Sequence, residues 1–244
     1  MDPNRKTTYQ HLAEADDLSR RTFEDWPVFS HTVAFPPALL MGSSGSHRLQ
    51  DYLVAGTCLW QMLTRYLPPD ARVLDIGCGC AKLARFLASD PRVADYVGFD
   101  PIAACIEWNR RYVLPISGPR FRFEHIDLYS AEYNPHGKVD PDRLAFPVAT
   151  SGIDVVVAAS VFTHLLEPTA RHYLAQSARV LKPGGKLVLS VHIEPPAGQR
   201  YAGDEARIDV DPEYFLGLAV ERGLSLHEAL GEFCGQQMLI LERD

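Results

Sequence analysis

Apolar and polar positions alternate in short runs along the chain, and their periods predict buried strands separated by helices. Residues 72–76 form an apolar run that ends in closely spaced glycines, and the amphipathic stretch 82–88 follows. This change of period indicates a buried strand that turns sharply into a helix. A second apolar run spans 96–100, and a third run, 121–127, alternates with period two. Each of the three runs carries an aspartate at or near its end.

The second half of the chain continues this order of elements. Residues 153–159 are almost continuously apolar, as expected for a strand that is buried on both faces of a parallel sheet. A predicted helix from about 168 to 180 leads through the Pro-Gly-Gly turn at 183–185 into a fifth strand. The last two predicted strands, near 224–230 and 236–241, have a short connection, so we expect them to pair as an antiparallel hairpin.

Strands that alternate with helices imply a parallel sheet, so we predict an α/β fold with a Rossmann-like, doubly wound arrangement. Two further helices are predicted ahead of the first strand, at about 6–25 and 46–66, with a Pro-, Gly- and Ser-rich loop at 33–46 between them. Two long irregular segments, 129–152 and 194–209, interrupt the later part of the chain. Loops of this length in compact domains are usually functional or disordered, and we expect the first of them near the open face of the sheet.

The turn after the first strand carries the pattern Asp75-x-Gly77-x-Gly79-x-Ala81. Glycines at these positions allow a tight turn and let a ligand approach the backbone closely. A dinucleotide-binding fingerprint would require a glycine at the sixth position counted from Gly77, where Lys82 stands. The Gly-Lys-Ser/Thr ending of a phosphate-binding loop is also absent.

This pattern resembles motif I of the class I S-adenosylmethionine-dependent methyltransferases, with Ala81 in place of the last glycine. Further matches follow in the order of that family: the run that ends at Asp100, the run that ends at Asp127, and the Leu-Lys-Pro-Gly-Gly turn at 181–185. Together the matches cover about residues 71–191. The resemblance implies S-adenosylmethionine as cofactor, S-adenosylhomocysteine as product, and a seven-strand sheet, mostly parallel, with an antiparallel last strand.

The resemblance also implies a helical cap at 1–68 in front of a cofactor-binding core at 69–244. Members of the family often use such N-terminal helices to cover the ligand cleft. Tyr9, Trp26 and Phe29 are candidate aromatic residues of a lid, although packing is the more common role of large aromatic side chains.

The implied cofactor-binding residues lie at or next to the ends of the first four strands. Asp100 is implied at the ribose, because a carboxylate can accept hydrogen bonds from both hydroxyls. Asp127 and the backbone of Leu128 are implied at the adenine edge, and Pro101 and Ile102 against the adenine. The complete implied set is Asp75, Gly77, Cys78, Gly79, Asp100, Pro101, Ile102, Asp127, Leu128, Ala159 and Ser160.

Residues just after the fourth and fifth strands are the candidates for acceptor chemistry, because ligands of open α/β sheets bind outside the carboxyl ends of the strands. His164 and His192 stand there. A histidine can take a proton from a hydroxyl or ammonium acceptor near neutral pH. His164 is the first candidate for this base and His192 the second, although His164 could instead cap a helix and His192 could position the acceptor. His172 is expected at the surface of a helix.

Composition narrows the choice of partners. The chain has 31 acidic and 24 basic residues and a formal net charge of −7, and its basic residues form no stripe, which disfavours a nucleic-acid substrate. The Asn-Pro-Pro-Tyr signature of amino-methylating enzymes is absent after the fourth strand. No stretch reaches the roughly 20 apolar residues of a membrane span. Residues 1–21 lack an apolar signal core, so we expect a cytoplasmic protein with no membrane partner.

The five cysteines are an odd number, which favours reduced thiols. Cys78 and Cys80 suggest metal ligands, but within a tight turn their side chains point poorly at one tetrahedral centre. No second Cys/His pair has zinc-like spacing, so we expect no metal.

The sequence therefore predicts an enzyme that transfers the methyl group of S-adenosylmethionine to a small-molecule acceptor, with a hydroxyl oxygen as the favoured atom and His164 as the base. Two alternatives stay open: transfer to nitrogen or carbon by proximity alone, and cofactor binding without catalysis. No pattern in the chain identifies the acceptor. A homodimer is expected only because two-fold dimers are the commonest oligomers.

Overall fold

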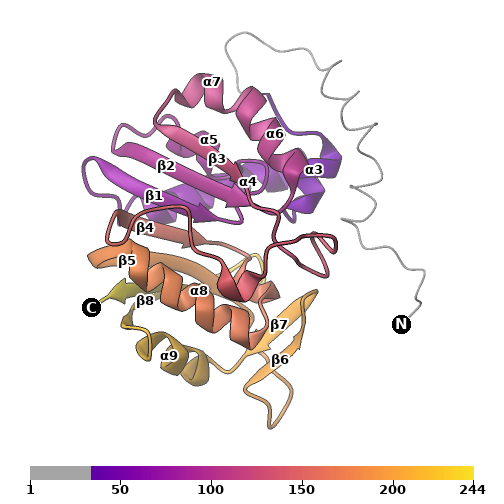
Figure 1. Cartoon of the computed structure of the whole chain (residues 1–244), viewed down its shortest axis with the longest axis vertical. Coiled ribbons are helices and arrows are strands. Elements are labelled where there is room, and N and C mark those ends of the chain that lie inside the picture. The colour runs from indigo at the N-terminus through magenta and orange to yellow at the C-terminus, as the bar shows by residue number, and fades with distance from the viewer. Residues whose placement is uncertain (1–33) are drawn as a thin grey trace, which may run out of the picture. The chain divides into compact units, whose positions relative to one another are not determined.

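A mixed β-sheet forms the centre of the fold (Figure 1). The computed structural model describes residues 34–244, so the predicted helix at 6–25 and the aromatic residues Tyr9, Trp26 and Phe29 lie outside the described residues. Within 34–244, seven strands form one sheet in the order β3-β2-β1-β4-β5-β9-β8, and β6 and β7 form a separate ribbon. The strands of the sheet are β1 (Ala71–Ile76), β2 (Val93–Asp100), β3 (Phe121–His125), β4 (Ile153–Ala158), β5 (Leu181–Val191), β8 (Leu224–Phe233) and β9 (Gln236–Arg243).

Strand pairing confirms the predicted sheet. β1 runs parallel to β4, with Val73 opposite Val155, and β4 runs parallel to β5. β9 lies antiparallel between β5 and β8, as the short connection at the end of the chain predicts. The pairing of β1 with β4 marks the reversal of strand order, which is where doubly wound sheets bind their ligands.

The core strand β4 shows why its sequence is continuously apolar. Val155, Val156, Val157 and Ala158 each have 0% of their surface exposed. These four positions lie in a strand with neighbours on both edges and buried faces on both sides, so the alternation typical of half-exposed strands is absent.

The helices follow the predicted order. The prediction at 46–66 is confirmed by α4, and the prediction at 168–180 by α8. The helix expected at 82–88 is reduced to the short α5. The helical segments are α3 (Ala38–Ser43), α4 (Leu49–Leu63), α5 (Ala84–Leu87), α6 (Ala103–Tyr112), α7 (Leu114–Ser117), α8 (Glu167–Val180) and α9 (Pro212–Val220), with 3-10 turns η1 (Pro141–Arg143) and η2 (Phe162–His164).

Two loop predictions were wrong in part. The segment 33–46 contains α3, because its short apolar run buries Leu40 and Met41 despite the surrounding prolines, glycines and serines. The segment 194–209 contains most of an antiparallel ribbon, formed by β6 (Tyr201–Asp204) and β7 (Arg207–Val210). Figure 1 shows the ribbon as a pair of short arrows in the later part of the chain.

The chain divides into two compact units. The first unit contains the described residues up to Thr64 together with Cys78–Pro91 and Gly98–Val139. The second contains Arg65–Gly77, Arg92–Val97 and Asp140–Asp244. The predicted boundary between a cap and a core after residue 68 stays a prediction.

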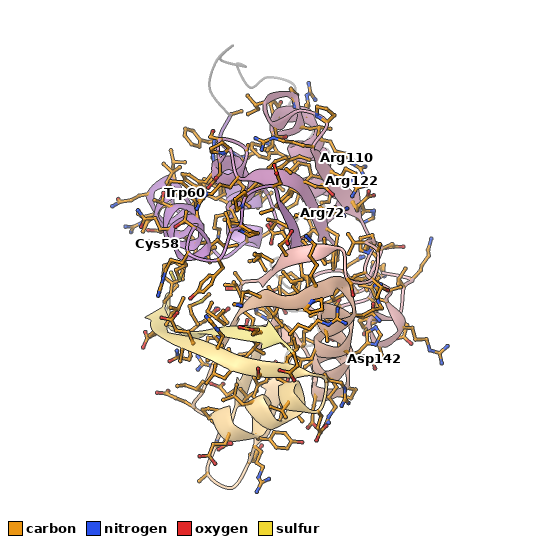
Figure 2. The ribbon with its side chains drawn as sticks, turned by 90° about the vertical axis from the view of Figure 1, so that its left-hand side faces the viewer. Cys58, Trp60, Arg72, Arg110, Arg122 and Asp142 are labelled. Carbon is orange, nitrogen blue, oxygen red and sulfur yellow. The ribbon has the colours of Figure 1, made fainter. Side chains whose placement is uncertain are left out.

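Each unit has its own aromatic packing. In the first, Trp60 of α4, labelled in Figure 2, stacks on Phe86 with 6.3 Å between ring centroids and donates a hydrogen bond of 3.0 Å to Asp90. In the second, Phe162 and Phe215 pack edge to face with 5.6 Å between centroids. Figure 1 shows α8 running beside β5 within this unit.

Candidate functional site

The glycine turn after β1 has the backbone conformation that its sequence predicts. Gly77 and Gly79 have φ of 66° and 50°, in the left-handed region where glycine alone avoids a steric penalty. A Cβ on Gly79 would lie 3.0 Å from the Cβ of Ser44, so the turn has no room for a side chain there. Ala81, which replaces the last glycine of the motif, has φ of 60°, and the departure from the family pattern therefore carries backbone strain.

Both backbone polar groups of Gly79, its N–H and its carbonyl, make hydrogen bonds within the first unit. Its N–H donates to Asp100 Oδ2 at 2.8 Å, and its carbonyl accepts from Asn109 Nδ2 at 2.7 Å. The other oxygen of Asp100, Oδ1, accepts from the N–H of Ile102 at 2.8 Å. Asp100 and the glycine turn, which the sequence places 21 residues apart, are thus joined directly in the structure.

Burial controls the charge of Asp100. The residue is only 5% exposed, and burial raises the pKa of its carboxyl to about 6 although the N–H groups of Ile102 and Gly79 act in the opposite direction. A carboxylate offers about four lone-pair positions. The two backbone donors occupy one on each oxygen, so a second hydrogen bond to each oxygen, as a vicinal diol would make, is chemically available.

Two residues that the sequence reasoning missed support this turn. Asn109 lies on α6 with no exposed surface, and Tyr52 lies on α4 and donates its hydroxyl proton to the carbonyl of Cys80 at 2.8 Å. A polar residue on the buried face of α6 is the available signal for Asn109. Tyr52 offers no such signal, because its ring alone accounts for its place in the core.

Asp127 and Leu128 are ordered by the long segment that follows them. Asn134 donates to Asp127 Oδ1 at 3.0 Å, and the carbonyl of Asp127 accepts from the N–H groups of Lys138 and Val139 at 2.8 Å each. The N–H of Leu128 donates to the carbonyl of Ile126 at 2.6 Å, so its predicted role at the adenine would require sharing that hydrogen bond. Part of the segment 129–152 therefore shapes the end of β3.

Pro101 and Ile102 follow β2 and are half-buried. His125 Nε2 lies 3.2 Å from the carbonyl oxygen of Pro101, which holds this corner against the end of β3. Cys78 is buried and its N–H donates to the carbonyl of Phe99 at 3.1 Å.

In the second unit, Asp75 is buried inside the sheet. Its Oδ2 accepts a hydrogen bond of 2.6 Å from the hydroxyl of Tyr96, and only 5% of its surface is exposed. The motif acid is thereby fixed by a neighbouring strand. A carboxylate held in this way can orient the turn that follows it.

Ser160 begins the segment after β4. Its N–H donates to Ser190 Oγ at 2.7 Å, and its hydroxyl donates to Gln236 Oε1 at 2.9 Å. Its φ of 54° is unusual for a residue with a side chain and marks a strained turn at the end of the strand. Ala159, immediately before it, is half-buried.

His164 and His192 lie close enough for the charge of His192 to influence the pKa of His164. His164 Nδ1 lies 2.8 Å from the backbone carbonyl of Glu205, and His192 Nδ1 lies 3.1 Å from that of Gly235. Burial lowers the pKa of His164, the Glu205 carbonyl counteracts this in part, and the charge of His192 lowers the pKa further. The lowered pKa favours the neutral imidazole, which is the state that a general base requires.

His172 departs from its expected place at the surface. It is half-buried, and its Nε2 lies 2.7 Å from the carbonyl of Leu144. This contact ties α8 to the segment before β4 and gives His172 a structural role.

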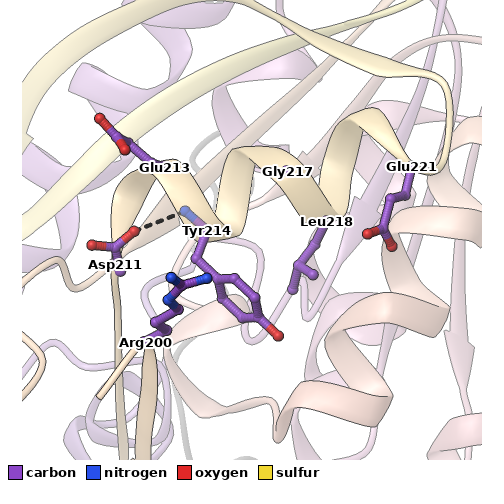
Figure 3. Close-up of a pocket in the computed structure, with 7 residues that line it drawn as sticks. All are labelled: Arg200, Asp211, Glu213, Tyr214, Gly217, Leu218 and Glu221. Atoms are coloured by element: carbon purple, nitrogen blue, oxygen red, sulfur yellow. Dashed lines mark hydrogen bonds between the residues drawn. The ribbon is translucent and has the colours of Figure 1, made fainter. Parts of the chain in front are cut away.

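A separate cavity of about 350 Å³ lies along α9 in the second unit (Figure 3). None of the predicted cofactor or catalytic residues is among its lining residues. Those residues are Arg200, Asp211, Glu213, Tyr214, Gly217, Leu218 and Glu221.

Residues 34–244 contain no group of three or more His, Cys, Asp or Glu side chains placed to hold a metal ion. None of the five cysteines, all of which lie in the described part of the chain, forms a disulfide. Over the same part of the chain, no helix combines the length and the apolar character that crossing a bilayer requires.

Comparison with known proteins identifies the family. A family described as "Methyltransferase domain" matches residues 50–220, which is well over half of the chain. The chain belongs to this family. S-Adenosylmethionine is the cofactor of the related proteins, so the resemblance seen in the sequence is confirmed.

A curated relative is 27-O-demethylrifamycin SV methyltransferase of Amycolatopsis mediterranei, 28% identical over 156 residues. The match covers 63% of this chain and 51% of the relative, so this methyltransferase-family chain spans about half the length of that protein.

Two solved structures share the fold. A TehB-like S-adenosylmethionine-dependent methyltransferase from Corynebacterium glutamicum has a TM-score of 0.56 at 17% identity, covering 96% of this chain and 99% of the other. The 1,6-didemethyltoxoflavin-N1-methyltransferase of Burkholderia thailandensis, with bound 1,6-didemethyltoxoflavin and S-adenosylhomocysteine, has a TM-score of 0.56 at 15% identity, covering 100% and 94%.

Proposed function

We propose that this protein transfers the methyl group of S-adenosylmethionine to a small-molecule acceptor, with a hydroxyl oxygen as the acceptor atom and His164 as the general base. The observation that carries the proposal is the buried contact between Asp100 and the left-handed glycine turn, in a chain whose residues 50–220 match the methyltransferase family. The name of the curated relative also specifies methylation of a small molecule.

The residues of the first unit fit this cofactor. Glycine is required at position 79, because a Cβ there would lie 3.0 Å from the Cβ of Ser44, and its backbone groups are held by Asp100 and Asn109. Asp100 is fixed by two backbone donors and retains the capacity to accept from the two ribose hydroxyls. Asp127, ordered by Asn134, provides an acceptor for the adenine amino group.

The base is needed only for some acceptors. S-Adenosylmethionine supplies a strongly electrophilic methyl group, so the protein mainly has to bind, orient and exclude water. A hydroxyl must in addition lose its proton, and a neutral imidazole of lowered pKa can accept it at pH 7. A nitrogen or carbon acceptor that is already nucleophilic would need proximity alone, which is the runner-up reaction.

The test combines binding with transfer. Calorimetric titration with S-adenosylmethionine and S-adenosylhomocysteine measures the cofactor site, and methyl-labelled cofactor measures transfer to panels of hydroxyl, amine and carbon acceptors. Once an acceptor is found, His164→Gln is expected to lower the transfer rate by about 10²–10⁴-fold with cofactor affinity unchanged. His172→Gln is the matched control, because His172 makes its own carbonyl contact elsewhere.

Each outcome has a distinct meaning. An unchanged rate in His164→Gln would remove the base and favour transfer by proximity. Cofactor binding without transfer to any acceptor would favour a non-catalytic protein. Absence of binding to either form of the cofactor would contradict the proposal as a whole.

A further inference from the structure

The β6–β7 ribbon makes two hydrogen bonds to consecutive residues of the segment after β4. Glu205, in the turn between β6 and β7, presents its backbone carbonyl to His164 Nδ1 at 2.8 Å. Tyr201, at the start of β6, donates its hydroxyl proton to the backbone carbonyl of Leu165 at 2.7 Å. All four residues belong to the second unit. The ribbon therefore contacts both the ring of His164 and the backbone beside it.

The contact with Glu205 determines which ring nitrogen of His164 carries the proton. A backbone carbonyl can only accept a hydrogen bond, so Nδ1 must be the donor. In the neutral ring, Nε2 then carries the lone pair that accepts a proton. The same logic operates in metal and catalytic sites, where the partner of one ring nitrogen fixes the function of the other.

The backbone of the ribbon requires a glycine at position 203. Gly203 has φ of 118°, and a Cβ at that position would lie 1.9 Å from the carbonyl oxygen of Arg207. The last residue of β7, Val210, is fixed by its N–H, which donates to the carbonyl of His192 at 2.8 Å. An ion pair between Arg207 and Asp209, with N···O distances of 2.7 and 2.9 Å, lies along β7.

We propose that the β6–β7 ribbon is the positioning element for His164, with the Glu205 carbonyl selecting the Nδ1–H tautomer and Tyr201 holding the adjoining backbone. Among the residues that the structure describes, the charges of His192 and Glu205 act on His164. Gly203 is the residue on which the ribbon depends. The importance of this tautomer for catalysis rests on the proposed function of His164 as base, but the tautomer itself does not.

The experiment reads the tautomer directly, without an acceptor. The full chain labelled with ¹⁵N-histidine gives nitrogen chemical shifts for each ring nitrogen, and the spectrum of His164→Gln assigns the signals of His164. Gly203→Ala and Tyr201→Phe perturb the ribbon. The control is Gly217→Ala on α9, where an added Cβ meets no atom within 4 Å.

In the wild type and in Gly217→Ala, we expect one Nδ1–H form of neutral His164, with the Nδ1 proton slow to exchange with water. In Gly203→Ala the ring should exchange between both tautomers, and in Tyr201→Phe the Nδ1 proton should exchange faster while the tautomer is kept. Because Tyr201→Phe removes only one hydroxyl, it tests the proposal even if Gly203→Ala fails to fold.

The proposal is overturned if wild-type His164 carries its proton on Nε2. It is also overturned if Gly203→Ala folds with a disrupted ribbon and an unchanged tautomer, or if Tyr201→Phe leaves the exchange of the Nδ1 proton unaltered. These outcomes are independent of activity. A wild-type Nδ1–H tautomer together with full transfer activity in His164→Gln would instead refute the base and leave the positioning contact intact.

Discussion

Asp100 is the residue whose protonation the structure connects most directly to ligand binding. Burial raises the pKa of its carboxyl to about 6 in the absence of cofactor, and the ionised form is the one that accepts from two hydroxyls. The affinity for S-adenosylhomocysteine should therefore fall as the pH drops through about 6, approaching tenfold per pH unit below it. Calorimetric titration between pH 5 and 8 measures this profile.

Stability should respond to Asp100 in the opposite sense. Its pKa in the folded protein lies above that of the unfolded chain, so between about pH 4 and 6 the folded state binds more protons. This contribution to stability is present below pH 4 and is lost as the pH rises through 6. An affinity that stays flat from pH 8 to 5 would contradict the assignment of Asp100 to the ribose, since its charge would then be irrelevant to binding.

At this scale, sequence reasoning singled out residues whose type is required by backbone or charge, and their roles toward the cofactor stay predictions. Gly77 and Gly79 are recognisable because only glycine suits a left-handed turn, and Asp100 because an acid at the tip of an apolar strand needs an explanation. Asn109 and Tyr52 were missed because each supports the turn through one hydrogen bond from a helix far along the chain. Such contacts have no local pattern.

Among the elements, α6 has a second role besides covering the sheet. It carries Asn109, whose amide donates to the Gly79 carbonyl at 2.7 Å in a fully buried position. Asn109→Ala leaves that carbonyl without its donor, so we expect the free energy of unfolding to fall by about 1–3 kcal/mol and the affinity for S-adenosylhomocysteine to weaken. Denaturant unfolding and calorimetry measure the two effects.

The matched control for α6 is Glu107→Ala, an exposed position on the same helix. We expect it to change stability by no more than about 0.5 kcal/mol. If Asn109→Ala loses stability but binds S-adenosylhomocysteine as tightly as the wild type, then the hydrogen bond from Asn109 to Gly79 supports the fold and is unimportant for cofactor binding.

The elements also explain which predictions from periodicity succeeded. The strand β4 was recognisable as a continuously apolar run and the helix α8 by its helical period, because the sheet buries both faces of β4 and one face of α8. The ribbon β6–β7 has two strands of four residues each, and hydrogen bonds connect it to His164, Leu165 and His192. β7 alternates exposed and buried residues, but over only four positions, and β6 shows no such alternation, so the segment was expected to be irregular.

For the whole molecule, cofactor binding should appear as a gain in thermal stability. A ligand that binds only the folded state at 100 times its dissociation constant stabilises it by about 2.7 kcal/mol. For a chain of this size, 1 kcal/mol corresponds to roughly 2–4 °C, so S-adenosylhomocysteine should raise the midpoint of thermal unfolding by about 5–11 °C. Differential scanning calorimetry measures the shift.

The Asp100→Ala variant tests whether the rise in the midpoint of thermal unfolding comes from ligand bound at the predicted cofactor site. Removal of the carboxylate eliminates both charge-assisted acceptors for the ribose, so the shift in this variant should largely disappear at the same ligand concentration. Glu107→Ala should keep the full shift, because Glu107 is exposed on α6 and is not among the predicted cofactor residues. An equal shift in Asp100→Ala would place the ligand elsewhere, and the cavity along α9 would then be the next site to test, because its lining includes none of the predicted cofactor residues.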